Sequence, residues 1–194
     1  MSLRDRLWDR PLGAGYWFWP LRLPARMVLR RRLKRCGKRT SFDPITSTFV
    51  GLGNISLGED VFVGPRCFIS ADRVAVSIGD DTIIGPEFCA IAGDHEFESP
   101  GTLYRESSRG ENAPIEIGAN VWIGARVTVL KGVRVGDGAV IAAGSLVTND
   151  VPSMTVAAGA PAQVVRKRFT GQDAEVHRER LQSLGGRVRV PGGS

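Results

Sequence analysis

Cysteine, histidine and long apolar runs are all scarce in this chain. It has three cysteines among 194 residues, odd in number and without a repeated spacing, which argues against a disulfide framework or a zinc ribbon. Its only histidines are His95 and His177, so a zinc site built from three different imidazoles is also excluded. The apolar run at residues 11–21 is too short to span a bilayer, which takes about 20 residues, and it lacks a clear signal-peptide cleavage site. We therefore expect a chain that needs no metal and has no transmembrane helix.

A six-residue period runs through the second half of the chain. The six hexads are led by Ile117, Ile123, Val129, Val135, Ile141 and Val147. Four positions after each leader stands a small or aliphatic residue: Val121, Val127, Val133, Ala139, Ser145 and Val151. A period of six fits neither a helix nor an isolated strand, so it predicts a repeat architecture in which each hexad forms a short strand and a turn. Three hexads would close one triangular coil, and stacking the coils buries their shared interior.

The same phase appears earlier and then stops at a loop. Its leaders there are Leu57, Val63, Ile69, Ile78 and Ile84, with an insertion around residues 72–75. Residues 93–114 are rich in polar residues, proline and glycine and include His95. We predict that they form a loop projecting from one corner of the coil, which is a common place for a functional site.

Residues 113–169 resemble the hexapeptide-repeat acyltransferases. The strings NVWIGA, GVRVGDGAVIAAGSLVTNDVP and GAPAQVVR are nearly identical to family strings, and the preceding GDHEF matches the loop that holds the family's catalytic histidine. The chain is most similar to the maltose, galactoside and nodulation O-acetyltransferases and to the polysaccharide O-acetyltransferases. The resemblance covers residues 54–169 and implies an all-β fold, a left-handed parallel β-helix. The left-handedness comes from the resemblance alone. The general rule for parallel strands would predict right-handed crossovers.

Three segments are expected along the chain. Residues 1–45 are predicted to form a basic, aromatic arm that is helical or irregular. Residues 46–169 are predicted to form the β-helix acyltransferase domain, with the loop at 93–114. Residues 170–194 should contain a short helix over 173–184, with His177 as a solvated surface histidine, followed by a flexible tail at 185–194.

Positive charge is concentrated in the N-terminal arm. The first forty residues hold twelve Lys or Arg and two Asp, a net of +10, whereas the whole chain is +6, which leaves −4 for the remainder. Aromatic residues beside clustered arginines fit an arm that lies on an anionic membrane. Alternatively Trp8, Trp17 and Trp19 pack on the coil or on a neighbouring subunit and leave the arginines solvated. No nucleic-acid-reading fold accompanies the charge, so we expect no nucleic-acid partner. The expected location is cytoplasmic, and peripheral on the inner membrane face if the arm binds lipid.

The resemblance implies an acetyl-CoA-dependent O-acetyltransferase with His95 as the general base. Histidine suits this task because imidazole titrates near neutral pH, and here it would take the proton of a hydroxyl that attacks acetyl-CoA directly. Asp94 and Glu96 flank His95, but adjacent side chains on an extended backbone point apart, so neither is an obvious carboxylate partner. The backbone N–H of Ala125 is the oxyanion donor that the resemblance implies.

The same resemblance implies the ligand contacts. The coenzyme A contacts would be Trp122, Gly124, Ala142, Ala143, Gly144, Thr148, Arg166 and Lys167. Asp72 would help to bind the acceptor or orient His95, and Arg105 would order the loop or contact the acceptor. Structural roles are the alternatives: residues 142–144 as a plain turn, Trp122 as a corner cap and Arg105 as a solvated side chain.

The acceptor is expected to be a carbohydrate, such as a polysaccharide or a lipid-linked glycan precursor. Alternatives are N-acetylation of an amino sugar, transfer to another small-molecule hydroxyl, and a catalytically silent assembly scaffold. His95, Trp122 and GAPAQVVR argue against the scaffold, since a scaffold needs only the hexads. The resemblance further implies a homotrimer with active sites between subunits.

Overall fold

The computed structural model describes residues 19–184. The predictions for Trp8, Trp17 and the tail at 185–194 concern residues outside this part, as does the side chain of Trp19.

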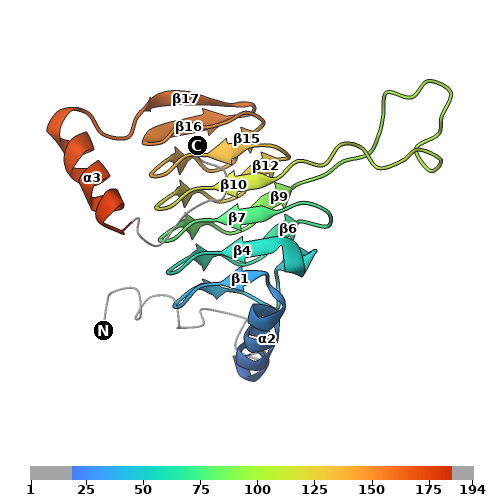
Figure 1. Ribbon diagram of the computed structural model, residues 1–194, viewed down its shortest axis with the longest axis horizontal. Helices are drawn as coiled ribbons and strands as arrows, with labels where there is room; N and C mark the ends of the chain where they lie inside the picture. Colours follow the sequence, from blue (N-terminus) through green and yellow to red (C-terminus); the bar gives the residue numbers. More distant parts are fainter. Residues whose placement is uncertain (1–18, 185–194) are drawn as a thin grey trace.

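Three parallel sheets form the faces of a triangular prism (Figure 1). The first sheet contains β1 (Arg35–Cys36), β4 (Ile55–Leu57), β7 (Val76–Ile78), β10 (Ile115–Ile117) and β13 (Arg134–Val135). The second contains β2 (Ser41–Phe42), β5 (Phe62–Val63), β8 (Ile83–Ile84), β11 (Trp122–Ile123), β14 (Val140–Ile141), β16 (Thr155–Gly159) and β17 (Ala162–Lys167). The third contains β3 (Thr48–Val50), β6 (Phe68–Ser70), β9 (Cys89–Ile91), β12 (Thr128–Leu130) and β15 (Leu146–Val147). From β1 to β15, successive strands enter successive sheets, and β16 and β17 then both join the second sheet. All pairs are parallel except β16 with β17. The predicted parallel β-helix is therefore confirmed.

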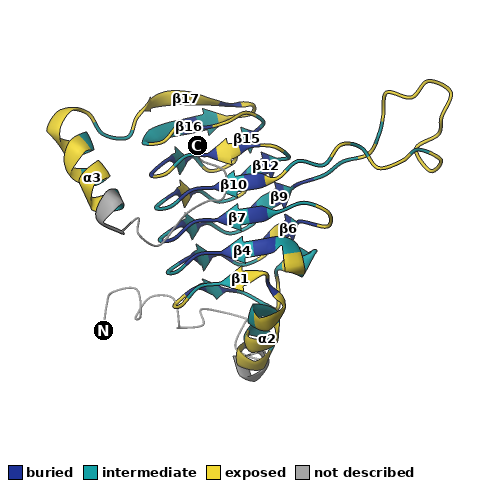
Figure 2. Cartoon of the chain, in the orientation of Figure 1, coloured by how far each residue is buried: buried dark blue, intermediate teal, exposed yellow. Residues whose placement is uncertain are grey.

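The inward positions of the hexads form the core. All twelve residues predicted to point inward in the second half of the chain are at most 5% exposed. This follows from strand geometry, because residues two apart share one face of a strand. Figure 2 shows buried positions in the strands along the middle of the prism, whereas β17 is mostly exposed. One polar side chain in this interior is fully satisfied. The Thr82 hydroxyl donates to Gly118 O at 2.9 Å and accepts from Val121 N–H at 3.2 Å, which joins adjacent coils.

The coil begins earlier than the sequence predicted. β1 and β2 lie within residues 1–45, the expected arm, yet they pair in register with β4 and β5. Cys36 stands opposite Leu57, and Phe42 stands opposite Val63. These two residues occupy leader positions without being aliphatic, which hid the period. The boundary therefore lies at Arg35 and not at residue 46.

Two helices flank the coil in the described part of the chain. α2 (Trp19–Arg32) lies at its N-terminal end, and α3 (Gly171–Leu184) confirms the predicted C-terminal helix (Figure 1). A 3-10 turn, η2 (Leu52–Asn54), precedes β4.

His177 is not the solvated histidine that the sequence predicted. Its Nε2 lies 3.1 Å from Asn120 Oδ1, and its ring centroid lies 4.9 Å from that of Phe169. Arg168 Nη1 donates to the same Asn120 Oδ1 at 3.1 Å and to Gly138 O at 2.9 Å. Burial lowers the pKa of His177, and the charge of Arg168 lowers it further. Asn120 is 57 positions away along the chain, so no local pattern could reveal this contact.

Candidate functional site

A pocket opens at the base of the loop that joins β9 to β10. It lies on what we call the third edge of the prism, where the chain turns from the third sheet back to the first. Ten residues line it: Ser70, Asp72, Arg73, Val74, Ala92, Gly93, Asp94, His95, Arg109 and Asn112. The structure therefore brings Asp72 and His95 together, although they come from different coils.

Backbone pairing at the base of the loop holds His95 in place. His95 forms an isolated antiparallel bridge with Arg109, and Gly110 N–H donates to Asp94 O at 3.1 Å. Ala113 N–H donates to Ala92 O at 3.2 Å. The two chain segments entering and leaving the loop thus form a short ribbon, which fixes the backbone that carries the imidazole.

The carboxylates around His95 are engaged with other groups. Asp94 Oδ2 lies 2.6 Å from Lys131 Nζ, and Asp72 Oδ2 accepts from Arg109 Nη1 at 2.7 Å. Glu96 Oε1 accepts from Glu98 N–H at 2.7 Å. Within residues 19–184 no side chain is hydrogen-bonded to the imidazole of His95. The imidazole nitrogens are thus left available to a ligand.

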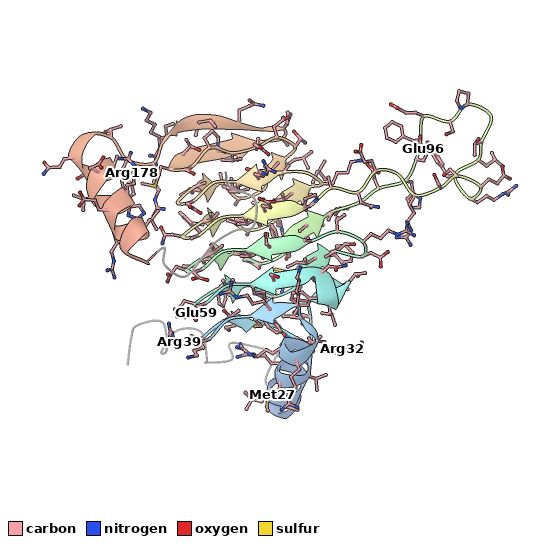
Figure 3. The ribbon with its side chains drawn as sticks, viewed as in Figure 1. Met27, Arg32, Arg39, Glu59, Glu96 and Arg178 are labelled. Carbon is pink, nitrogen blue, oxygen red and sulfur yellow. The ribbon has the colours of Figure 1, made fainter. Side chains whose placement is uncertain are left out.

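The sequence predicted a role at the site for Arg105 and none for Arg109, which the structure places in the pocket lining. Arg109 reaches Asp72 across 37 positions, a pairing that no spacing rule announces. The side chain of Arg105 is 78% exposed, and among the described residues its one ion pair is with its neighbour Glu106 at 3.4 Å. Arg105 lies beyond the His95–Arg109 bridge, in the loop that extends far from the prism and includes the labelled Glu96 (Figure 3). Arg105 is not part of the pocket lining.

A second group of predicted residues lies on another edge. We call it the second edge, where the chain turns from the second sheet to the third. Three successive coils turn there with the segments Gly64–Pro65–Arg66, Gly85–Pro86–Glu87 and Gly124–Ala125–Arg126. In the first two segments the middle residue is proline, which has no backbone N–H. Ala125, the middle residue of the third segment, does have a backbone N–H. No described residue accepts a hydrogen bond from the Ala125 N–H. It is therefore available to a ligand, as an oxyanion donor must be.

Close coil stacking at this turn depends on glycine. A Cβ added at Gly85 would lie 2.7 Å from Ala125 N, inside the van der Waals limit. Gly144 N–H donates to Ala125 O at 2.8 Å from the following coil. The backbone of Ala125 is thus held between Gly85 of the preceding coil and the hydrogen bond from Gly144 of the following coil.

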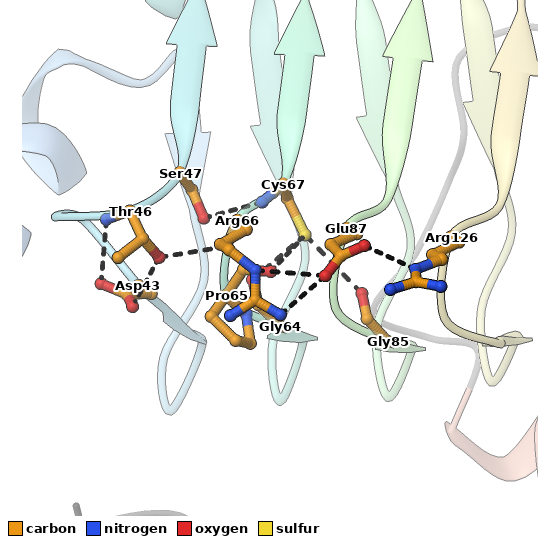
Figure 4. Close-up of polar contacts among 10 residues, drawn as sticks. All are labelled: Asp43, Thr46, Ser47, Gly64, Pro65, Arg66, Cys67, Gly85, Glu87 and Arg126. Atoms are coloured by element: carbon orange, nitrogen blue, oxygen red, sulfur yellow. Dashed lines mark hydrogen bonds and ion pairs between the residues drawn. The ribbon is translucent and has the colours of Figure 1, made fainter. Parts of the chain in front are cut away.

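A charged ladder runs along the same edge (Figure 4). Glu87 Oε1 accepts from Arg66 Nη2 at 2.7 Å, and Glu87 Oε2 accepts from Arg126 Nε at 2.6 Å. The hydrogen bonds from Arg66 and then Arg126 lower the pKa of Glu87. These groups are exposed, so the ladder adds little stability, but it orders side chains directly beside the Ala125 turn.

The residues predicted to contact coenzyme A lie on three different parts of the prism: the second edge, β17 and the third edge. Gly124, Ala142, Ala143 and Gly144 share the second edge, and the indole of Trp122 in β11 is exposed beside it. A Cβ at Gly144 would meet nothing within 4 Å, so the surface is open there. Arg166 and Lys167 are exposed on β17. Thr148, by contrast, follows β15 and therefore lies on the third edge.

His95 and Ala125 thus lie on different edges of one prism. His95 leaves the third sheet after β9, whereas Ala125 leaves the second sheet after β11. One chain alone does not bring the two predicted catalytic groups together. A site that uses both requires two copies of the chain.

Within residues 19–184, no group of three or more His, Cys, Asp or Glu side chains is arranged to hold a metal ion. None of the helices in this range has the length and apolar character needed to cross a bilayer.

Known proteins resemble this chain in sequence and in fold. Residues 114–149 match the family model of the bacterial transferase hexapeptide (six repeats), and residues 54–86 match that of the hexapeptide repeat of succinyl-transferase. The galactoside O-acetyltransferase of Escherichia coli K12 is 39% identical over 118 residues, which cover 59% of this chain and 54% of that protein. The chain thus spans about half the length of the curated relative it matches.

Solved structures align over more of the chain. A maltose O-acetyltransferase from Clostridium difficile 630 is 30% identical, with a TM-score of 0.66 and coverage of 85% of this chain and 82% of that one. A hexapeptide-repeat acetyltransferase from Vibrio cholerae O1 biovar eltor, complexed with acetyl coenzyme A, is 25% identical, with a TM-score of 0.66 and coverage of 88% and 100%.

Proposed function

Because the chain belongs to the hexapeptide-repeat acyltransferases of the left-handed β-helix fold, we propose that it transfers an acetyl group from acetyl-CoA to a hydroxyl of a carbohydrate. The observation that carries this proposal is the position of His95 in the wall of a polar pocket, with Asp72 and Arg109 beside it. The relative that holds acetyl coenzyme A supports the choice of donor.

In this reaction His95 acts as the general base. Its imidazole takes the proton of the acceptor hydroxyl while that oxygen attacks the carbonyl carbon of the thioester. The new C–O bond forms, and the carbonyl oxygen becomes negative and accepts a hydrogen bond from the Ala125 N–H. The C–S bond then breaks, and the proton passes from His95 to the departing thiolate of coenzyme A.

The second edge suits the acetyl-CoA donor. Small residues at Gly124 and 142–144 let an extended pantetheine arm lie close to the backbone and share its hydrogen-bonding groups, beside the exposed indole of Trp122. Arg166 and Lys167 on β17 suit the phosphates of coenzyme A, since cationic side chains form charge-assisted hydrogen bonds with phosphate. Thr148 would reach the donor only from the third edge of another chain.

The pocket on the third edge suits a sugar. Asp72 offers carboxylate acceptors, while Arg109 and Asn112 offer donors, and a sugar hydroxyl both donates and accepts. Arg105 lies outside this lining, and we propose that it orders the outer loop.

We expect the active protein to be a homotrimer, as the family resemblance implies. His95 and Ala125 lie on different edges of one prism, so each site needs two neighbouring subunits. In a trimer the third edge of one subunit can face the second edge of the next, which completes each site. Light scattering should then give a mass of three chains. A fully active protein with the mass of one chain would contradict this assembly.

Incubation with acetyl-CoA and a panel of sugars tests the proposed reaction. Mass spectrometry should detect an added acetyl group on at least one neutral sugar, with release of free coenzyme A. Calorimetry should show binding of acetyl-CoA to the protein alone. Acetylation only of amino sugars would indicate N-acetyl transfer. Absence of both binding and transfer would favour a catalytically silent scaffold.

A further inference from the structure

Helix α2 is fixed to the N-terminal end of the prism, at the opposite end from β16 and β17 (Figure 1). Leu33 is 7% exposed, and Leu29 packs against the same core. The Arg30 guanidinium donates to Thr40 O and to Gly37 O, both at 2.7 Å. The helix is therefore a rigid part of the coil end and not a loosely tethered arm.

Three large apolar side chains are exposed on the outward side of α2, ahead of the arginines of its last turn. Leu23 is 59% exposed, and Met27 and Val28 are each 57% exposed. Leu23 and Met27 are four residues apart and so neighbour each other on the helix surface. Large apolar side chains that cluster on an exposed surface mark an interaction site more often than isolated ones do.

Cations border these apolar side chains. Arg31, Arg32, Lys34 and Arg35 are all exposed, and none of them forms an ion pair with another residue between 19 and 184. Met27 and Arg32 both project from α2 in Figure 3. Residues 19–40 hold nine Lys or Arg and no Asp or Glu, so positive charge is concentrated at this end of the part of the chain that the structure describes.

We propose that this end of the prism docks on an anionic lipid surface. A helix that lies in a membrane interface buries apolar side chains at the headgroup boundary and places Arg and Lys among anionic headgroups. α2 has 14 residues, which suits lying on a bilayer and not spanning it. Nucleic acid would satisfy the cations but would leave Leu23, Met27 and Val28 without a role, so lipid accounts for more of the surface.

The consequence for function rests on the acetyl transfer proposed above. Because α2 is rigidly attached, docking would hold the coil end against the membrane and keep the loop pocket near its surface. A lipid-linked glycan is an acceptor that such an enzyme could meet there. The docking itself does not depend on this reaction.

Sedimentation of the full chain with vesicles tests the docking. The protein should pellet with phosphatidylcholine vesicles that contain phosphatidylserine, and not with phosphatidylcholine alone. Arg31→Gln with Arg32→Gln should weaken the partition coefficient by about 30-fold, on the order of fivefold per cation. Leu23→Gln with Met27→Gln should weaken it by roughly tenfold. These four side chains are not in the catalytic machinery, so turnover in solution should be unchanged.

A charge-matched control is Arg134→Gln with Arg178→Gln, which removes two exposed cations elsewhere on the surface and should leave vesicle binding unchanged. The proposal is overturned if this control weakens binding as much as the α2 variants do. It is also overturned if both α2 variants bind vesicles like the unmodified protein. A third contrary result would be that single-stranded RNA binds the arginines and lysine of this end, while the Leu23→Gln, Met27→Gln variant binds both the RNA and the vesicles normally.

Discussion

Replacing His95 with alanine should lower turnover by roughly 10²- to 10⁴-fold, the range expected for loss of a general base. Without the imidazole, the attacking hydroxyl must lose its proton to water. No other histidine can substitute, since the only other one, His177, lies on α3 and contacts Asn120 and Phe169. Steady-state assays with acetyl-CoA and the acceptor found in the sugar panel measure the effect.

Binding of acetyl-CoA separates this catalytic role from a structural one. The affinity of the His95→Ala variant for acetyl-CoA should stay close to that of the unmodified protein, because the proposed donor contacts lie mainly on the second edge. His177→Gln is the matched control. It replaces the other histidine, keeps a donor toward Asn120, and should retain turnover. Undiminished turnover in the His95→Ala variant would remove His95 from the mechanism.

Replacing Ala125 with proline should lower turnover by roughly 10²- to 10³-fold, the usual cost of removing one oxyanion-hole donor. Proline removes the N–H and leaves the carbonyl that accepts from Gly144 N–H. The fold should tolerate the change, because Pro65 and Pro86 occupy the same turn position in the two preceding coils. Each of these prolines also follows a glycine, as Ala125 does.

Retention of the fold is the control for this variant. Its melting temperature, the affinity for acetyl-CoA and the mass in solution should all match those of the unmodified protein, so that only the rate is lost. Normal turnover with an intact fold would show that the Ala125 N–H is not the donor.

Mixing the two inactive variants adds a test of shared sites. If each site takes His95 from one subunit and Ala125 from its neighbour, co-refolded trimers of the two variants contain some intact sites. Activity should therefore return in the mixture. No recovery from properly mixed trimers would place both groups within one subunit, against the separation of the two edges.

Much of the architecture could be predicted because the β-helix is periodic. Each inward position recurs every six residues, so a run of aliphatic leaders specifies the strand, the turn and the buried face together. The interruption after Ala90 located the projecting loop, and with it His95. The period failed where Cys36 and Phe42 stood as leaders, because identifying it depended on aliphatic residues at those positions. The coil consequently begins at Arg35.

Contacts between coils are what the sequence by itself left open. The sequence determined the stack, the loop and the residue types at the turns, because these follow from local spacing and side-chain chemistry. Only the tertiary structure decided that Arg109 pairs with Asp72, that His177 contacts Asn120, and that His95 and Ala125 lie on different edges. The physical reason is distance along the chain. These pairings join residues 37 and 57 positions apart, and they depend on how coils stack and where a loop folds back, which no local pattern records.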